Sequence, residues 1–289
     1  MSVLSQFFSQ ASKLIPIEVL VIGGGGGARG ASSTAPGNDG AGAGLFVYDN
    51  VFAIAGIPYT INIGSGGAGG LAFGSNGNPT NIPGLGINAF GGQGTGSQNT
   101  TESVIYTGST AGNKSATFSD TVIVPDKIIS SNVGGLGAPT TGSGGEGGGG
   151  SFSAGNASPP SDAGGSGGNG LECNCIGYPT LILGGGGSGG NSNAGPITPT
   201  QGGAGGGGAG GAKLGSGSNG TANTGGGGGG GGGSPVVPTT GGSGGSGVVY
   251  IRYPTAYSAA TVTGNTPATP QSGYYVYQWN SGPGSITFN

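Results

Sequence analysis

The chain contains no histidine, and only 5% of its 289 residues are charged. Without histidine, Ser-His-Asp and Cys-His nucleophile systems are excluded, and so are most transition-metal sites. The nine carboxylates are scattered; the nearest pairs in sequence are Asp39 with Asp49 and Asp120 with Asp126. A carboxylate pair of the glycosidase type is the one catalytic arrangement left open. We therefore expect a protein that is not an enzyme, with no catalytic residues and no cofactor.

Positive charge, cysteine and long apolar runs are also scarce. Six Lys and Arg residues form no basic patch, so no nucleic-acid partner is expected. No segment approaches the roughly 20 apolar residues of a membrane span, and the first 22 residues lack the basic start and cleavage site of a secretion signal. Cys173 and Cys175 are at most half a metal site. They are predicted to be buried thiols or a local disulfide, and no metal site is expected.

Glycine is what the sequence has in excess, with 79 residues. Such a composition is often typical of disorder, but 32% hydrophobic residues in compact blocks favour a packed state here. Polyglycine-II segments have about three residues per turn, and without side chains they can approach closely enough to hydrogen-bond to one another. The nine glycines of residues 225–233 predict a segment crowded on every side. The glycine tracts are therefore predicted to form a packed scaffold.

Apolar, β-branched blocks interrupt the glycine tracts and predict strands. They lie at residues 17–22, 45–48, 51–55, 59–63, 104–106, 122–124, 248–253, 274–279 and 285–288. Asp49-Asn50 predicts a hairpin turn between the second and third of these blocks. The predicted fold class is all-β or irregular, with β-strands capping a packed polyglycine-II bundle or sandwich and with a short N-terminal helix.

This organisation divides the chain into consecutive parts. We predict an N-terminal anchor segment at residues 1–16 and a glycine-rich domain at 17–254, with a strand-and-loop insertion at 97–133. Residues 255–289 are predicted to form a C-terminal β-hairpin cap around the turn at 280–284.

The N-terminal segment has apolar residues at spacings of three and four, which predict a short helix from Ser2 to Ile15 ended by Pro16. The helix could be a lid packed on the protein's own core, or an anchor that docks on a partner. The candidate anchor residues are Leu4, Phe7, Phe8 and Leu14.

Loops rich in Asn, Ser, Pro and Thr separate the glycine tracts at residues 151–162, 191–201 and 219–224. Such residues provide adaptable hydrogen bonding in binding loops, and a rigid scaffold would present them together. The alternative is that polar loops simply keep a weakly charged surface hydrated. The candidate receptor-binding residues are Asn156, Asp162, Asn191, Asn193, Asn219 and Asn223.

Three stretches carry a resemblance to a known family. They are the strand 17–22 with its five following glycines, the stretch Tyr59 to Gly70, and the closing stretch from Ser243 to Pro254. Together they resemble glycine-rich virion proteins of tailed phages, cyanophages included. Some phage tail-fibre tip adhesins are similar in composition, with a polyglycine-II sandwich that carries receptor-reading loops at one end.

The resemblance implies a virion structural protein on the external surface of the particle, which binds a host glycan or protein through its loops. Other virion proteins would be partners of the N-terminal segment, and an oligomer is possible. A capsid or tail decoration protein that stabilises the particle is the alternative. A glycine-rich extracellular or ice-binding protein is a third class, although ice binding predicts flat faces of fixed three-residue period.

Overall fold

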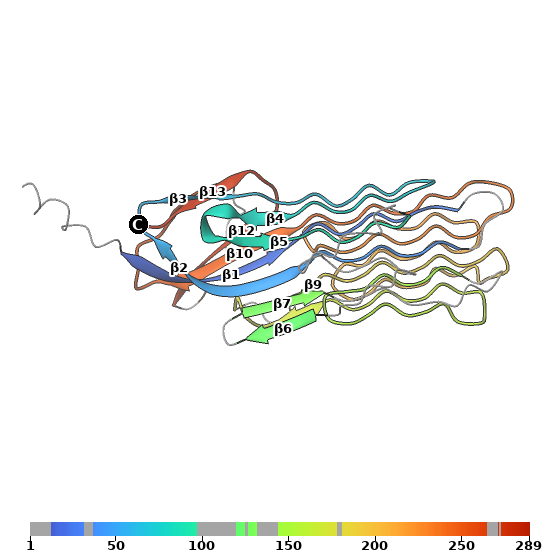
Figure 1. Cartoon of the computed structure of the whole chain (residues 1–289), viewed down its shortest axis with the longest axis horizontal. Helices are drawn as coiled ribbons and strands as arrows, with labels where there is room; N and C mark the ends of the chain where they lie inside the picture. Colours follow the sequence, from blue (N-terminus) through green and yellow to red (C-terminus); the bar gives the residue numbers. More distant parts are fainter. Residues whose placement is uncertain are drawn as a thin grey trace, which may run out of the picture.

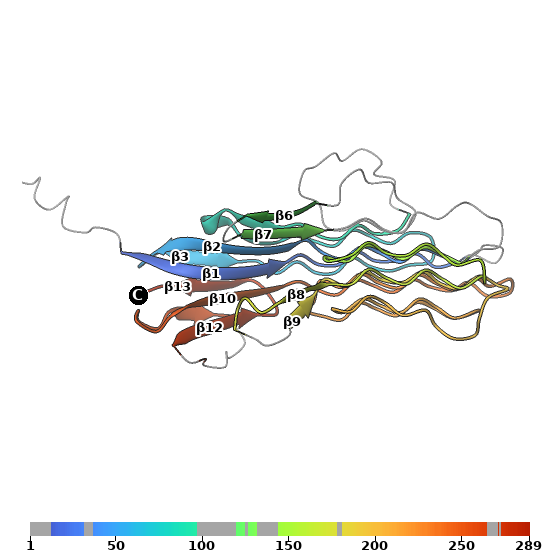
Figure 2. The ribbon, with the colours of Figure 1, turned by 90° about the horizontal axis from the view of Figure 1, so that it is seen from below.

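The structure is a computed structural model that describes residues 13–31, 37–96, 120–124, 127–131, 144–177, 181–264, 271 and 273–289. The molecule is elongated, with β-sheets gathered at one end and long extended segments running from them to the other (Figure 1). We call these two parts the β end and the glycine rods. A view turned by 90° shows the same division (Figure 2).

Short antiparallel sheets make up the β end, which agrees with the predicted all-β class. One sheet has six strands in the order β12-β10-β1-β2-β7-β6, a second has the order β11-β13-β3, and β4 with β5 and β8 with β9 form two further pairs. The elements are β1 Leu14–Ile22, β2 Phe46–Ile54, β3 Pro58–Ile61, β4 Thr80–Ile82, the 3-10 turn Pro83–Leu85, β5 Ile87–Ala89, β6 Asp120–Val124, β7 Lys127–Ser131, β8 Leu171–Cys173, β9 Leu181–Leu183, β10 Val248–Pro254, β11 Thr261–Thr263, β12 Tyr274–Trp279 and β13 Gly284–Thr287.

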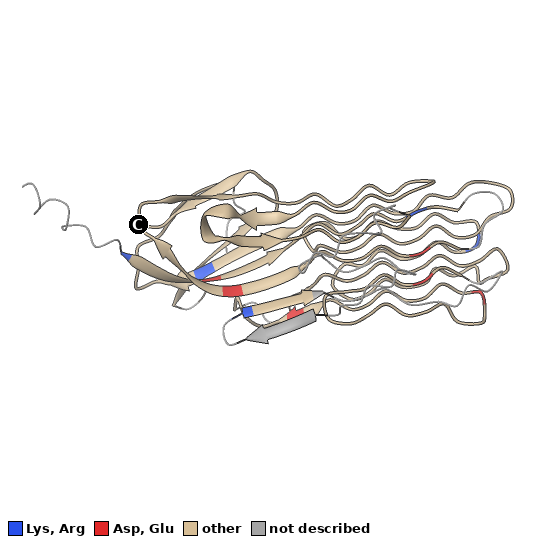
Figure 3. Cartoon of the chain, in the orientation of Figure 1, with Lys and Arg blue, Asp and Glu red and all other residues tan. Residues whose placement is uncertain are grey.

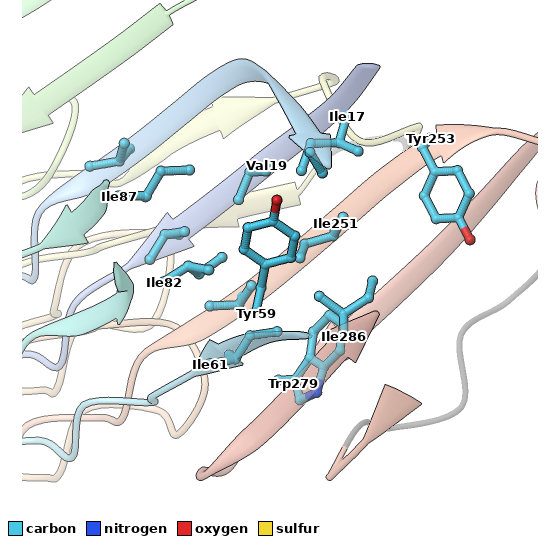
Figure 4. Close-up of a cluster of buried hydrophobic side chains, with 14 of the residues drawn as sticks. Ile17, Val19, Tyr59, Ile61, Ile82, Ile87, Ile251, Tyr253, Trp279 and Ile286 are labelled. Carbon is cyan, nitrogen blue, oxygen red and sulfur yellow. The ribbon is translucent and has the colours of Figure 1, made fainter. Parts of the chain in front are cut away.

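The main core lies between the six-stranded sheet and the smaller sheets of β3, β13, β4 and β5. Side chains at Ile15, Ile17, Val19 and Val21 are buried because alternate residues of β1 face this side. Figure 4 shows this cluster, in which Tyr59 and Trp279 lie among the aliphatic side chains. The largest side chains of the protein therefore seal the end from which the glycine rods emerge.

The opposite face of the six-stranded sheet carries a second, smaller core. There Leu20 and Ile22 pack with Phe46 and with Ile176, which follows β8. Beyond this cluster the face becomes polar: Arg252 forms an ion pair with Glu18 at 2.6 Å and lies over the ring of Tyr274.

The glycine rods are extended segments outside the sheets, joined to one another by backbone hydrogen bonds. They comprise residues 23–30, 37–44, 64–70, 74–79, 90–96, 144–150, 164–170, 184–191, 201–204, 207–211, 215–221, 225–233 and 241–247. Within a rod, successive N–H groups point to different neighbours, and every third residue returns to the same one. This is the bonding expected of polyglycine-II helices with three residues per turn.

The rod at 23–30 illustrates the packing. Its first N–H groups donate in three directions, with Gly23 bonded to Leu45, Gly24 to Asn78 and Gly25 to Gly245, at 2.9 to 3.1 Å. Its carbonyl groups accept from three further rods, at residues 64–70, 90–96 and 225–233, and the first of these also accepts from the Gly30 N–H. The rod is thus enclosed by six neighbours, as the prediction of segments crowded on every side requires.

The nine-glycine run at 225–233 is enclosed in the same way. It donates to the rods at 184–191, 23–30 and 215–221 and accepts from those at 207–211, 37–44 and 241–247. A Cβ atom placed on Gly228 would overlap the carbonyl group of Gly242. Because such overlaps recur along the rods, a side chain cannot be accommodated at these positions without moving a neighbouring backbone.

Three predictions of local structure were wrong. Asp49-Asn50 makes no turn, because β2 runs through it as one strand paired along its whole length with β1. Leu14 and Ile15 begin β1 instead of ending a helix, since alternate burial of Ile15 and Ile17 favours a strand; the rest of the predicted helix lies outside the described residues. Strands β12 and β13 form no hairpin, because β12 pairs with β10 and β13 with β11 and β3.

Other predicted strands were confirmed. The blocks 17–22, 59–63, 122–124 and 248–253 correspond to β1, β3, β6 and β10, whereas 104–106 lies outside the described residues. The short strands β4, β5, β7, β8, β9 and β11 were not predicted. No helix in the described part of the chain has the length and apolarity needed to cross a membrane.

Candidate binding surface at the loop end

The glycine rods are joined in pairs by loops at the end of the molecule opposite the sheets. We call this the loop end, and it comprises residues 71–73, 158–162, 192–200, 212–214 and 234–240. In Figures 1 and 2 the yellow-green to orange loops of this set form the tip farthest from the β strands, whereas the cyan loop 71–73 lies set back from it. Lys13 and Asn289, by contrast, lie together at the β end, where the Lys13 Nζ donates to the Asn289 backbone carbonyl at 3.3 Å.

A buried asparagine holds the largest of these loops. Asn191 has no exposed surface, and its Nδ2 donates to the carbonyl groups of Pro196 and Thr198 at 2.9 and 2.7 Å. Its Oδ1 accepts from the Gly164 N–H and the Thr200 hydroxyl at 2.9 and 2.8 Å. All the bonding capacity of this amide is used within the chain, so loop 192–200 is fixed to the rods.

Buried hydroxyl groups hold the loop at 234–240. Thr239 is 2% exposed; its hydroxyl donates to the Gly232 carbonyl at 2.8 Å and accepts from the Ala31 N–H. The hydroxyl of Ser234, 1% exposed, accepts from the N–H of Val237 at 3.1 Å. The loops also bond to one another, because the Lys213 N–H donates to the Pro196 carbonyl and the Ser192 N–H to the Asp162 carbonyl.

Apolar side chains occupy the outside of the loop end. The exposed aliphatic and aromatic residues are Leu71 (54%), Phe73 (60%), Ile197 (82%), Leu214 (44%), Val236 (71%) and Val237 (52%). They come from four separate loops. Polar residues such as Asn193, Lys213 and Thr240 are exposed here as well, but apolar side chains normally lie inside, so loops that are fixed by buried polar groups and expose apolar ones depart from the ordinary arrangement. This departure makes the loop end the candidate functional site.

Charge is sparse across this surface. Figure 3 shows isolated charged positions along the rods, with no gathering of one sign at the loop end. Arg29, at the end of a rod, donates to the Asn38 side chain at 2.7 Å. Glu146 is buried, and desolvation raises the pKa of its carboxyl above the usual value, although a hydrogen bond from the Ser158 N–H opposes the shift. Charge therefore gives this surface little selectivity.

The predicted receptor residues are distributed over the molecule instead of meeting in one place. Asp162 and Asn193 lie at the loop end, and Asn193 is exposed. Asn156 is exposed on a rod flank, where its amide donates to Ser166 at 2.6 Å. Asn191 is buried, as described above, so it supports a loop and is not itself a contact surface.

The last two predicted residues are involved in contacts between rods. Asn219 is exposed on a rod and accepts from the Ser243 N–H at 2.8 Å. Asn223 lies in a turn near the β end, where it bonds to Ser246. Sequence reasoning concentrated on polar residues and missed the exposed aliphatic ones. A usable signal was present in Pro235-Val236-Val237-Pro238, where flanking prolines mark a loop in which no strand can continue.

Of the predicted anchor residues, only Leu14 lies in the described part of the chain. It is 54% exposed at the start of β1, and Phe52 and Ile57 are exposed near it at 65% and 43%. Leu4, Phe7 and Phe8 lie outside the described residues. The β end therefore has its own apolar patch, well separated from the loop end.

Chemically reactive groups do not gather in the described structure. Within the described residues no three His, Cys, Asp or Glu side chains are placed to hold a metal ion. Cys173 and Cys175 form a disulfide at the end of β8, one of the two states that their spacing predicted.

A family model described as a glycine-rich domain matches residues 5–254. The chain belongs to this family. The match includes every glycine rod and all the loops of the loop end, so the glycine-rich domain is the part of the chain that builds the candidate surface. No curated protein and no solved structure matches the chain.

Proposed function

We propose that this glycine-rich protein is a structural component of a tailed-phage virion and acts there as a surface or tail-fibre adhesin. In this role the β end is attached to the particle and the loop end contacts the host. The observation that carries the proposal is the pattern of burial at the loop end, where buried polar groups fix loops that expose Ile197, Val236 and Val237.

Two further observations support this orientation. Lys13 and Asn289 lie together at the β end, opposite the loop end. The exposed residues Leu14, Phe52 and Ile57 also lie there and offer an apolar surface for attachment to another virion protein. The resemblance of the flanking strands and glycine tracts to phage virion proteins is the basis for placing the chain in a particle.

Adsorption of purified protein to host cells tests the proposal. We expect the wild-type protein to bind host cells and to compete with phage adsorption. Replacement of loop 192–200 by a glycine-serine segment of equal length is expected to reduce both effects. A matched replacement in the turn at 55–57, at the β end, is expected to leave them unchanged. Equal adsorption by all three proteins would contradict the proposal.

Decoration of the capsid or tail is the second candidate, and the exposed apolar patch at the β end favours it equally. The number of copies per particle and the part of the chain that attaches to the particle distinguish decoration from the adhesin function. If removal of residues 1–15 strips hundreds of copies from the particle, while loop replacements leave adsorption intact, the protein stabilises the shell and is not an adhesin.

A further inference from the structure

We propose that the loop end binds a lipid surface, by inserting its aliphatic side chains among the headgroups and upper acyl chains. The inference rests on the proposed function, in which the loop end is the contact end, and it names the chemistry of the partner. Its first basis is exposure. Ile197 and Val236 are 82% and 71% exposed, so they project from the molecule and do not line a recess. Projecting side chains suit a partner that needs no matching shape.

The second basis is residue type. Protein interfaces concentrate their binding energy in Trp, Tyr and Arg. All the described Tyr residues and Trp279 lie in or next to the strands of the β end, and Arg29 is partly buried against Asn38. The loop end instead exposes Leu71, Phe73, Ile197, Leu214 and Val236. Leu and Phe are among the side chains with which interfacial helices insert shallowly into lipid, and here they are joined by Ile and Val.

The third basis is rigidity. Exposed apolar groups on a free loop would fold back and cover themselves, since burial of apolar area is favourable. Here Asn191, Ser234 and Thr239 are buried and bonded to the loop backbones, so the loops are held open. Pro196 and Pro235 restrict the backbone further. The apolar groups are thereby kept available for a partner.

The fourth basis is charge. Within the loops of the loop end, the charged residues are Lys213 and Asp162, which balance one another. A surface without net charge gains nothing from anionic headgroups. The binding is therefore expected to depend on apolar burial, with similar affinity for neutral and anionic vesicles and little response to salt.

Flotation of the full chain with lipid vesicles tests the inference. The probes are vesicles of pure phosphatidylcholine and vesicles that also contain phosphatidylglycerol, each at low and high salt. The wild-type protein is expected to float with both. The triple variant Ile197→Ser, Val236→Ser, Val237→Ser is expected to lose at least about tenfold in vesicle affinity, because three apolar side chains are lost. Phe152→Ser is the control, because Phe152 is 64% exposed but lies outside the loop end, and this variant is expected to float as the wild type does.

Each outcome has a defined meaning. Circular dichroism and thermal unfolding must first show that the triple variant remains folded, which is expected because its three side chains contribute little to the core; if it is unfolded, Ile197→Ser alone is used. No flotation of the wild type, equal flotation of variant and wild type, or binding only to anionic vesicles at low salt would overturn the inference. If the triple variant loses adsorption to cells while the wild type binds no vesicles, the adhesin function stands and its partner is a protein or glycan.

Discussion

At the scale of single residues, glycine in this protein is a steric requirement more than a source of flexibility. Carbonyl groups of neighbouring rods occupy the space where a Cβ atom would lie at Gly25 and Gly228. Alanine is found within rods at Ala28 and Ala41, which are fully buried, so a methyl group is accepted only where the neighbours leave room. The identity of each rod residue is thus set by the rods around it.

The variant Gly228→Ala tests this steric requirement. The added methyl group would overlap the Gly242 carbonyl and force two rods apart, so we expect a loss of about 3 kcal/mol in the free energy of unfolding. Gly215→Ala is the control, because its nearest heavy atom would lie 3.2 Å away, at the edge of the bundle. Chemical denaturation measures both. Equal stability of Gly228→Ala and the wild type would show that the rods are looser than described.

The buried Glu146 gives a pH-dependent prediction. Desolvation raises its pKa when folded, and the charge of Asp39 adds to the increase. A carboxyl that holds its proton more tightly in the folded chain contributes stability below its unfolded pKa, and that contribution is lost as pH rises through the folded value. Glu146→Gln should therefore be more stable than the wild type at neutral pH, with a difference that shrinks as the pH falls through the raised pKa of the folded state and stays constant below the unfolded pKa. Thermal unfolding over this pH range checks the sign.

At the scale of elements, rods and strands stabilise the chain by different means. The strands gain stability from apolar burial, on one face where buried and exposed side chains alternate, as in β3, or on both faces, as in the second half of β1. The rods bury almost no side-chain volume and depend on backbone hydrogen bonds in three directions. These bonds are protected because each N–H lies inside the bundle. A rod is therefore ordered only when its neighbouring rods are in place to form these hydrogen bonds.

Hydrogen exchange distinguishes such rods from flexible glycine linkers. The amides of residues 227–233 all donate to other rods, and we expect them to exchange slowly, as core strand amides do. Exposed positions in loop 192–200, such as Asn193, are expected to exchange faster. Exchange of 227–233 at the rate of an unfolded peptide would contradict the packed-rod architecture.

At the scale of the whole molecule, the sheets and the rods are parts of the same continuous segments. Strand β1 runs directly into the rod at 23–30, and the rod at 241–247 runs directly into β10. These strands are neighbours in the six-stranded sheet, while their rods are neighbours in the bundle. The sheet thus sets the lateral order of the rods, and this order places the loops together at the far end.

This continuity predicts cooperative unfolding. Ile251→Ala removes a fully buried side chain from β10 and should cost about 3 kcal/mol. Because rods and sheet share their chain segments, the free energy of opening that protects the amides of rod 227–233 should fall by the same amount as that of the amides of β1. Native-state hydrogen exchange of the variant measures both regions. Unchanged protection of the rod would show that the two parts unfold separately.

Much of the fold could be predicted from the sequence, because its signals are local. Alternating apolar blocks marked β1, β3 and β10, and long glycine runs marked the rods. Pairing could not be read in the same way. Asp49-Asn50 has turn chemistry, but β1 extends far enough to hold it within a strand. Likewise β12 and β13 are close in sequence, yet β12 pairs with β10 in the six-stranded sheet and β13 pairs with β3 in a different sheet.

The candidate site was predicted less well than the fold. The sequence indicated that loops between rods carry the binding residues, and it favoured polar ones such as Asn191. Exposure is not a local property: Asn191 is buried because the rods close around it, and Ile197 is exposed because its loop passes beyond them. The useful contrast between buried polar and exposed apolar residues therefore appears only in the folded chain.

The sequence by itself determined which chemical groups this protein has and which kind of scaffold it can form. Its lack of histidine excluded catalytic triads that depend on that residue, and its glycine runs required a backbone-bonded scaffold, because no side chains were available to bury. The tertiary structure alone decided which rods are neighbours, which loops share an end and which side chains face water. These depend on hydrogen bonds between residues as distant as Gly25 and Gly245, whose partnership no local pattern encodes.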